Sequence, residues 1–142
     1  MAILGAVLLP LGDETYAVAS EHLREVVVAP RITALPGAPP SVLGLFSLRG
    51  SLLPIVDTAR LLGRAPLDGV PLALVVRSGN DMAALAATGQ PSVVDLDAMV
   101  RPAASPGASS VHPFAGGLVT VLDVESLLAR VGLGEHPAGM GG

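Results

Sequence analysis

Glycine and proline divide this chain into short apolar segments, and that division constrains its fold more than any other feature. The sequence has 17 Gly and 13 Pro among 142 residues, which leaves few stretches long enough for a helix of several turns. The segments between them are rich in Val, Leu and Ile, which favour strands. Short strands separated by turn residues are typical of small antiparallel barrels, whose closure also hides the sheet edges. The sequence therefore predicts an all-β protein.

The composition narrows the possible core and partners. Hydrophobic residues make up 51% of the chain and aromatic residues only 2%, so the core must be aliphatic. The absence of cysteine excludes disulfides and thiolate chemistry and favours a reducing compartment. The net charge is −4, and all eight basic residues are arginines scattered singly, so we expect neither nucleic-acid binding nor membrane insertion. The apolar N-terminus lacks a positive leader, so we expect no signal peptide.

Alternating apolar runs and turn residues predict nine strands and three short helical segments. The strands are expected at residues 3–9, 16–19, 23–29, 42–48, 51–56, 72–76, 82–88, 93–100 and 118–122. One helical turn is expected at 20–22 with Ser20 as its cap, and helices are expected at 58–62 and 124–131. Residues 35–40 and 102–110 are predicted to be loops, and residues 133–142 a flexible tail.

Two segments resemble each other enough to suggest an internal duplication. Residues 52–62 can be laid over residues 118–128, because each has an apolar strand, an aspartate, a short spacer and Leu-Leu. We favour duplication over a chance likeness of two amphipathic segments, and so predict two similar β-subdomains. In this matched context Asp57 and Asp123 are interpreted as helix N-caps rather than as a catalytic carboxylate pair.

A single arginine, Arg49, stands between two of the predicted apolar strands. Gly50 follows it and allows the positive φ of a tight turn. Burial of an unpaired guanidinium is costly, so Arg49 needs a partner. Two alternatives stay open: a structural ion pair with Asp57 or Glu25, or a contact displayed for another protein. The corresponding segment at 118–128 is preceded by Gly117 and carries no arginine, which favours binding.

The order of several motifs resembles the CheW family, the coupling proteins of bacterial chemotaxis. The matching blocks are Leu23-Arg24-Glu25-Val26, Leu35-Pro36-Gly37-Ala38-Pro39, Gly44-Leu45-Phe46-Ser47-Leu48-Arg49-Gly50, Leu53-Pro54-Ile55-Val56-Asp57, Arg60-Leu61-Leu62-Gly63, Leu122-Asp123 and Leu127-Leu128. The resemblance implies two five-stranded antiparallel SH3-like barrels, packed side by side around a shared core, with short helices that include one at the C-terminus. We expect one CheW-like domain over residues 1–132, with a first barrel at 14–64 and a second at 68–122 that the N-terminal strand joins by a crossover.

The resemblance also implies a function and a set of site residues. Such proteins are non-catalytic cytoplasmic adaptors without metal or cofactor. They couple the cytoplasmic tip of a methyl-accepting chemoreceptor to the regulatory domain of a CheA-type histidine kinase. The expected partner-binding residues are Arg49, Gly44, Leu48, Leu23 and Glu25, and the expected structural residues are Gly50, Pro54, Asp57 and Asp123. Strand periodicity places Leu23 and Glu25 on one face, where they form either a partner edge or a core residue beside a solvated charge.

The sequence departs from the family pattern in two places. Ser47 replaces an asparagine, and residues 84–88, followed by Pro91, lack the aspartate and the valine-rich strand expected in the second barrel. We expect that proline either to open the second barrel or to alter its binding edge, because proline removes a ladder donor. This leaves as alternatives a divergent adaptor for another pathway, such as surface motility, and a small-ligand-binding sensory domain. An enzyme is disfavoured, because no Gly-x-Ser-x-Gly motif occurs and the three histidines (His22, His112 and His136) are isolated.

Overall fold

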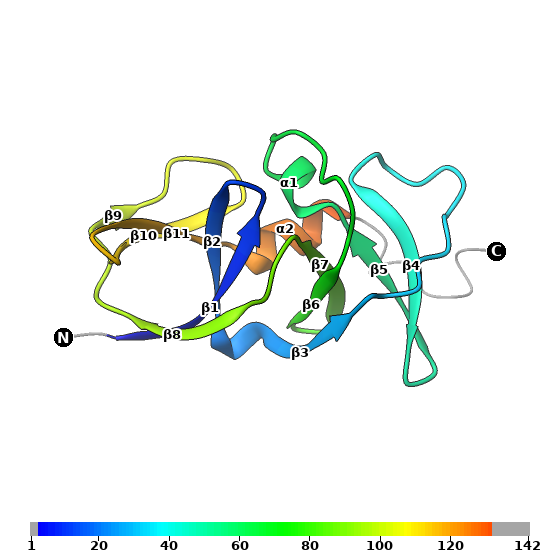
Figure 1. Cartoon of the computed structure of the whole chain (residues 1–142), viewed down its shortest axis with the longest axis horizontal. Helices are drawn as coiled ribbons and strands as arrows, with labels where there is room; N and C mark the ends of the chain where they lie inside the picture. The colour runs from blue at the N-terminus through cyan, green and yellow to red at the C-terminus, as the bar shows by residue number, and fades with distance from the viewer. Residues whose placement is uncertain (1–2, 132–142) are drawn as a thin grey trace.

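The computed structural model describes residues 3–131, which form two small sheets side by side (Figure 1). The terminal sheet has the order β8-β1-β2-β11-β10-β9, and the middle sheet has the order β3-β6-β7-β5-β4. The terminal sheet consists of β1 (Leu4–Leu11), β2 (Glu14–Ala19), β8 (Ser92–Leu96), β9 (Arg101–Pro102), β10 (Ala108–Phe114) and β11 (Gly117–Leu122). The middle sheet consists of β3 (Leu23–Val28), β4 (Val42–Leu48), β5 (Ser51–Val56), β6 (Leu72–Ser78) and β7 (Asp81–Ala87). The helical elements are η1 (Ser20–His22), α1 (Thr58–Leu61) and α2 (Val124–Val131).

The prediction of a mostly β fold with two small sheets is confirmed. Each sheet also contains one parallel pair, β5 with β7 and β11 with β2, so the sheets are not purely antiparallel. The residue ranges expected for the two barrels, 14–64 and 68–122, differ from the observed division of the strands between the two sheets. The chain leaves the terminal sheet after β2, builds the whole middle sheet, and returns at β8. Strands β6 and β7 therefore belong with β3–β5, not with the second half, because β6 pairs with β3 and β7 with β5.

The two sheets repeat one another in topology and in detail, as the duplication predicted. In each sheet a hairpin leads into a short helix, and its second strand pairs in parallel with a strand from another hairpin. The amide of Asp57 donates to the carbonyl of Ser41 at 2.7 Å, and the amide of Asp123 donates to that of Gly107 at 2.9 Å. These residues lie at matching positions, so the strand–Asp–helix unit occurs twice.

The main core lies between the sheets and belongs to both of them. Buried residues of β1, β2, β6 and β7 meet the apolar face of α2, which lies between the sheets in Figure 1. Its fully buried members include Leu9, Leu74, Leu85 and Leu127. The predicted aliphatic character of the core is confirmed, because the buried members of this cluster are Val, Leu and Ala apart from Tyr16. Neither sheet buries this face alone, so each depends on the other for its stability.

Both predicted aspartate caps are confirmed, and the predicted serine cap is wrong. Asp57 is buried; its Oδ1 accepts from the Arg60 amide at 3.0 Å and its Oδ2 from the Leu67 amide at 2.9 Å. Asp123 accepts from the Ser126 amide at 3.1 Å. At η1 the N-cap residue is Ala19 rather than Ser20, and no side chain caps that turn.

Two further expectations are corrected by the strand assignment. Strand β10 occupies part of the segment expected to be a loop at 102–110, because its polar residues and its proline hid the strand pattern. Residues 84–87 lie in β7 at the centre of the middle sheet, and Pro91 lies before β8 in the crossover between the sheets. Pro91 therefore interrupts no central strand and does not open the second half.

Two predictions concern the C-terminal end of the chain. The predicted tail at 133–142 and His136 lie outside the described residues. Within residues 3–131, the helices are too short and too polar to span a bilayer.

The two caps give a prediction about stability. Asp57→Ala should lower the free energy of unfolding by about 2–3 kcal/mol, because it removes a cap and leaves the partly buried Leu67 amide without its acceptor. Asp123→Ala should cost about 1 kcal/mol, since one bond is lost. Urea unfolding followed by circular dichroism measures both values. Equal losses of stability for the two variants would contradict the role of Asp57 as the acceptor for the Leu67 amide.

Candidate partner-binding surface

Arg49 lies at the tip of the β4–β5 hairpin, in a turn that the second repeat reproduces without arginine. Arg49 and Gly50 have φ values of 51° and 86°, and Ala115 and Gly116 in the β10–β11 hairpin have values of 50° and 79°. Two successive positive φ values define the tight turn that matches the twist of antiparallel strands. Because Ala115 adopts the same conformation, the backbone of the turn does not require an arginine.

The Arg49 side chain is exposed and forms an ion pair with Glu25 of β3. Its side chain is 76% exposed and that of Glu25 is 27% exposed. Arg49 is exposed because the apolar strands on either side of it end before the tip of the hairpin. Of the two candidate structural partners, Glu25 makes the contact, whereas Asp57 is buried at the cap of α1. A pair this exposed contributes at most about 1 kcal/mol to folding.

Strand β3 contains a bulge that separates Leu23 from Glu25. These residues face Val76 and Val75 of β6, which are consecutive, so the register shifts by one residue between them. Leu23 packs against the main core, and Val27, two residues beyond Glu25, packs against the Phe46 cluster on the other side. The prediction that Leu23 and Glu25 share a face is therefore wrong, since a bulge breaks the period of two.

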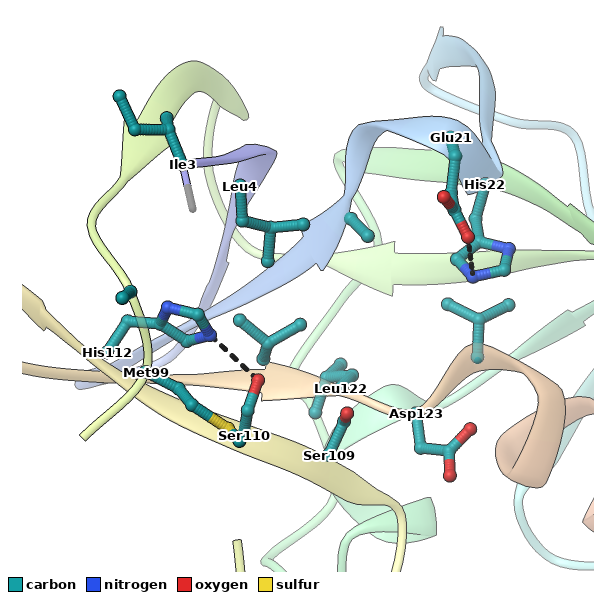
Figure 2. A pocket seen from close by; sticks show the side chains of 14 residues that line it. Ile3, Leu4, Glu21, His22, Met99, Ser109, Ser110, His112, Leu122 and Asp123 are labelled. Atoms are coloured by element: carbon teal, nitrogen blue, oxygen red, sulfur yellow. Dashed lines mark hydrogen bonds and ion pairs between the residues drawn. The ribbon is translucent and has the colours of Figure 1, made fainter. Parts of the chain in front are cut away.

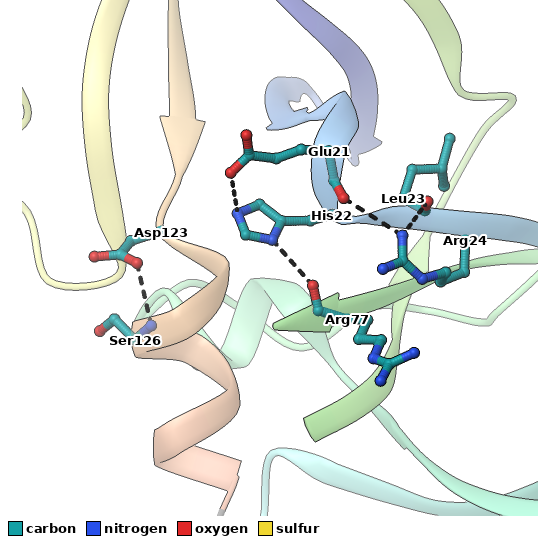
Figure 3. A network of polar contacts seen from close by, with 7 residues as sticks. All are labelled: Glu21, His22, Leu23, Arg24, Arg77, Asp123 and Ser126. Carbon is teal, nitrogen blue, oxygen red and sulfur yellow. Dashed lines mark hydrogen bonds and ion pairs between the residues drawn. The ribbon is translucent and has the colours of Figure 1, made fainter. Parts of the chain in front are cut away.

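Arg24, the residue at this bulge, folds its side chain back over η1 (Figure 3). Its guanidinium donates to the carbonyls of Leu23 at 3.1 Å and Glu21 at 3.4 Å. Beside it, the His22 ring donates from Nδ1 to the carbonyl of Arg77 at 3.0 Å, which fixes η1 to β6. The start of β3, where Leu23 lies, is therefore held by polar contacts on both sides.

Gly44 is required by packing. It is buried at a bulge in β4 with a φ of 153°, and a Cβ atom there would lie 2.2 Å from the carbonyl oxygen of Thr33. Thr33 crosses β4 at this point and exchanges two backbone hydrogen bonds with Leu45. Those bonds direct the polar groups of Leu45 away from Pro54, its partner in β5, so the proline removes no donor from that ladder. Gly50, in contrast, faces open space and is needed for its φ.

A groove runs beside the Arg49 hairpin. It has a volume of about 500 Å³, and its lining includes Val27, Phe46 and Leu52. Leu52 is 68% exposed, and Leu48, closer to the tip, is half-buried against the Phe46 cluster. We call Glu25, Val27, Arg49 and Leu52 the hairpin surface. It combines a guanidinium that Glu25 holds in place with the exposed aliphatic side chain of Leu52.

A second polar cluster connects the terminal sheet to the segment after α1. Tyr16 donates to Glu14 at 3.1 Å, and Arg64 pairs with Glu14 at 3.3 Å. Burial raises the pKa of the Tyr16 hydroxyl, and the bond to the Glu14 carboxylate raises it further. Tyr16 thus stays neutral and works as a structural donor. Over residues 3–131, no group of three or more histidine, aspartate or glutamate side chains is arranged to hold a metal ion.

Comparison with known proteins identifies the family. The sequence model of the CheW-like domain matches residues 5–132. The chain belongs to the CheW family. Over 58 residues it is 40% identical to a probable chemotaxis protein CheW of Rhizobium etli, a match that covers 41% of this chain and 37% of that relative. The fold is similar to the crystal structure of the scaffolding protein TtCheW from Thermoanaerobacter tengcongensis, with a TM-score of 0.78 at 18% identity over 86% of this chain and 90% of that one.

These comparisons show the family and the fold. The roles of individual residues stay predictions. The structure brings Arg49 and Glu25 together, places Leu48 and Leu52 nearby, and puts Leu23 and Gly44 in packed positions. Leu52 and the groove were missed from the sequence. The available signal was that both repeats carry a leucine two residues after the glycine of the hairpin turn, Leu52 and Leu118, and the structure shows both exposed.

The packing of Gly44 gives a second prediction. Gly44→Ala should lower the free energy of unfolding by about 2–3 kcal/mol, because the new methyl group meets the Thr33 backbone and the φ is unfavourable. Gly50→Ala, which meets nothing, should cost about 1 kcal/mol. Thermal and urea unfolding measure the difference. A Gly44→Ala protein as stable as the parent would show that the segment carrying Thr33 moves freely.

Proposed function

We propose that this protein is a cytoplasmic, non-catalytic adaptor that couples the cytoplasmic tip of a methyl-accepting chemoreceptor to the regulatory domain of a CheA-type histidine kinase. Membership of the CheW family supports this proposal, and so does the chemotaxis role named for the relative from Rhizobium etli. The fold presents surfaces for protein contacts on two connected sheets. We assign one of these partner contacts to the hairpin surface.

One observation carries the assignment: the exposed arginine at a turn that does not need it. The same turn in the second repeat carries Ala115, with nearly the same φ. Arg49 therefore contributes little to the fold, and its exposed ion pair stabilises the protein only weakly. A residue of this kind is better explained by binding than by folding.

The surroundings of Arg49 suit a protein partner. Arginine is enriched among the residues that dominate interface energies, and such residues lie beside apolar area that excludes water. Glu25 holds the guanidinium in place before binding, which lowers the entropy cost of ordering it. The groove beside Leu52 and Val27 supplies the apolar area. A partner with a carboxylate next to an aliphatic side chain matches this arrangement.

The binding role of Arg49 can be measured directly. Arg49→Ala should weaken binding to the regulatory domain of the co-encoded kinase or to the receptor tip by tenfold or more, which is about 1.4 kcal/mol. Its free energy of unfolding should change by less than about 1 kcal/mol. Isothermal titration calorimetry with each partner, together with urea unfolding, gives both numbers.

The matched control is Arg101→Ala, which removes an exposed arginine from β9 in the other sheet. This variant should bind both partners as the parent does. A folded Arg49→Ala protein with parental affinity for both partners would refute the assignment to the hairpin surface. Absence of binding by the parent to any co-encoded kinase or receptor would refute the adaptor function itself.

A further inference from the structure

A second cavity lies in the terminal sheet, away from the hairpin surface. It has a volume of about 490 Å³ and opens between the start of β1, η1, strand β10 and the beginning of α2. Figure 2 shows Ile3 and Leu4 on one side, and His112 and Ser110 along β10. This volume falls within the range of pockets that hold small organic molecules.

At the corresponding place in the middle sheet, side chains fill the space, and the internal repeat identifies the matching residues. In the middle sheet, Phe46 is buried, and Leu43 and Ile32 pack against its cluster. The matching residues in the terminal sheet are His112 and Ser109 on β10 and Met99 in the segment before β9. Met99 corresponds to Ile32 because the residues that follow them form the same hydrogen bond. The amide of Val100 donates to the carbonyl of Val111, just as the amide of Thr33 donates to the carbonyl of Leu45. The second repeat thus has His112 and Ser109 where the first has Phe46 and Leu43 of a packed apolar cluster.

The polar wall of the cavity is ordered by its own hydrogen bonds. His112 is buried; its Nδ1 donates to the carbonyl of Asp97 at 2.7 Å. In the neutral ring Nε2 is then an acceptor, and it receives the hydroxyl proton of Ser110 at 2.8 Å. A histidine and a serine held in this way keep the wall in one conformation, as a preorganised binding site requires.

Two carboxylates line the cavity, and one of them, that of Glu21, pairs at 3.5 Å with the ring of His22, which also lines it. Glu21 of η1 and Asp123 at the start of α2 both line it, and they lie on its η1 and α2 side in Figure 2. No arginine occurs among the described residues of the lining, and the chain contains no lysine. The aliphatic part of the wall comes from residues such as Leu4, Val121 and Val124. The cavity therefore offers an apolar floor with the Asp123 carboxylate at one edge and the Glu21–His22 pair at another.

We propose that this cavity binds a small organic cation, namely a protonated amine on an apolar body. The ammonium group pairs with the carboxylate of Asp123, and the hydrocarbon or aryl body contacts Leu4, Met99 and Val121. The Asp123 carboxylate selects against carboxylates and phosphates of the same size, since these would meet like charge. The site shares no residue with the hairpin surface, so it is independent of the adaptor role proposed above.

Three probes with similar phenyl bodies and different head groups test the proposal: 2-phenylethylamine, 2-phenylethanol and 3-phenylpropionate. Binding to the full chain is followed by the ¹³C-methyl signal of Met99 in methionine-labelled protein. The amine should shift this signal saturably and bind at least tenfold more tightly than the alcohol, and the carboxylate should bind more weakly still. Tighter binding of the carboxylate, or no shift with the amine at about 1 mM, an affinity near −4 kcal/mol, would overturn the proposal.

Two variants separate this cavity from other surfaces. Ser109→Leu installs the residue of the first repeat and fills the cavity, so it should abolish amine binding and leave the unfolding midpoint at or above that of the parent. Ser92→Leu, outside the cavity on β8, is the matched control and should bind as the parent does. Asp123→Asn keeps an N-cap residue but removes the charge, and should reduce the preference for the amine over the alcohol. Amine binding that survives Ser109→Leu would contradict this site.

Discussion

The shared core between the two sheets is the contact on which the rest of this structure depends. Each sheet is small and aliphatic, and each buries one face against α2 and against the other sheet. The chain secures this arrangement by its order, because the middle sheet is built between β2 and β8 of the terminal sheet. The middle sheet is a continuous segment of sequence and the terminal sheet is not, and the main core takes buried residues from both. Changes in the core should therefore affect both sheets in one cooperative transition.

Duplication of the fold frees some positions from structural demands. Both repeats keep the tight hairpin turn, the parallel strand pair and the aspartate cap, since each satisfies a backbone requirement. Where the repeats differ, the backbone accepts either side chain. Arg49 against Ala115 and Phe46 against His112 are two such differences, one on an exposed turn and one in a buried strand. The first supports a protein contact and the second a ligand cavity.

Much of the fold could be predicted from the sequence, because the strong signals are local. Apolar runs gave β4 and β5 with their observed bounds, and the Leu-Leu pattern after Asp57 and Asp123 gave both caps. The errors arise where local patterns are ambiguous. The bulge at β3 reversed the face of Glu25 relative to Leu23, and the polar strand β10 resembled a loop. The division between the sheets depends on the long-range pairing of β6 with β3 and of β7 with β5. The Arg49–Glu25 pair was one of two alternatives, and only the pairing of distant segments decides between them.

The central claim is that Arg49 contributes to partner binding and that neither hairpin turn needs an arginine in order to form. Transfer of the arginine between the two turns tests this claim most directly, with Arg49→Ala and Ala115→Arg combined in one protein. The account predicts parental stability within about 1 kcal/mol and no recovery of affinity for the kinase regulatory domain or the receptor tip, because Ala115 lies on the other sheet. Parental affinity in the transferred protein, or a large loss of stability, would contradict the account.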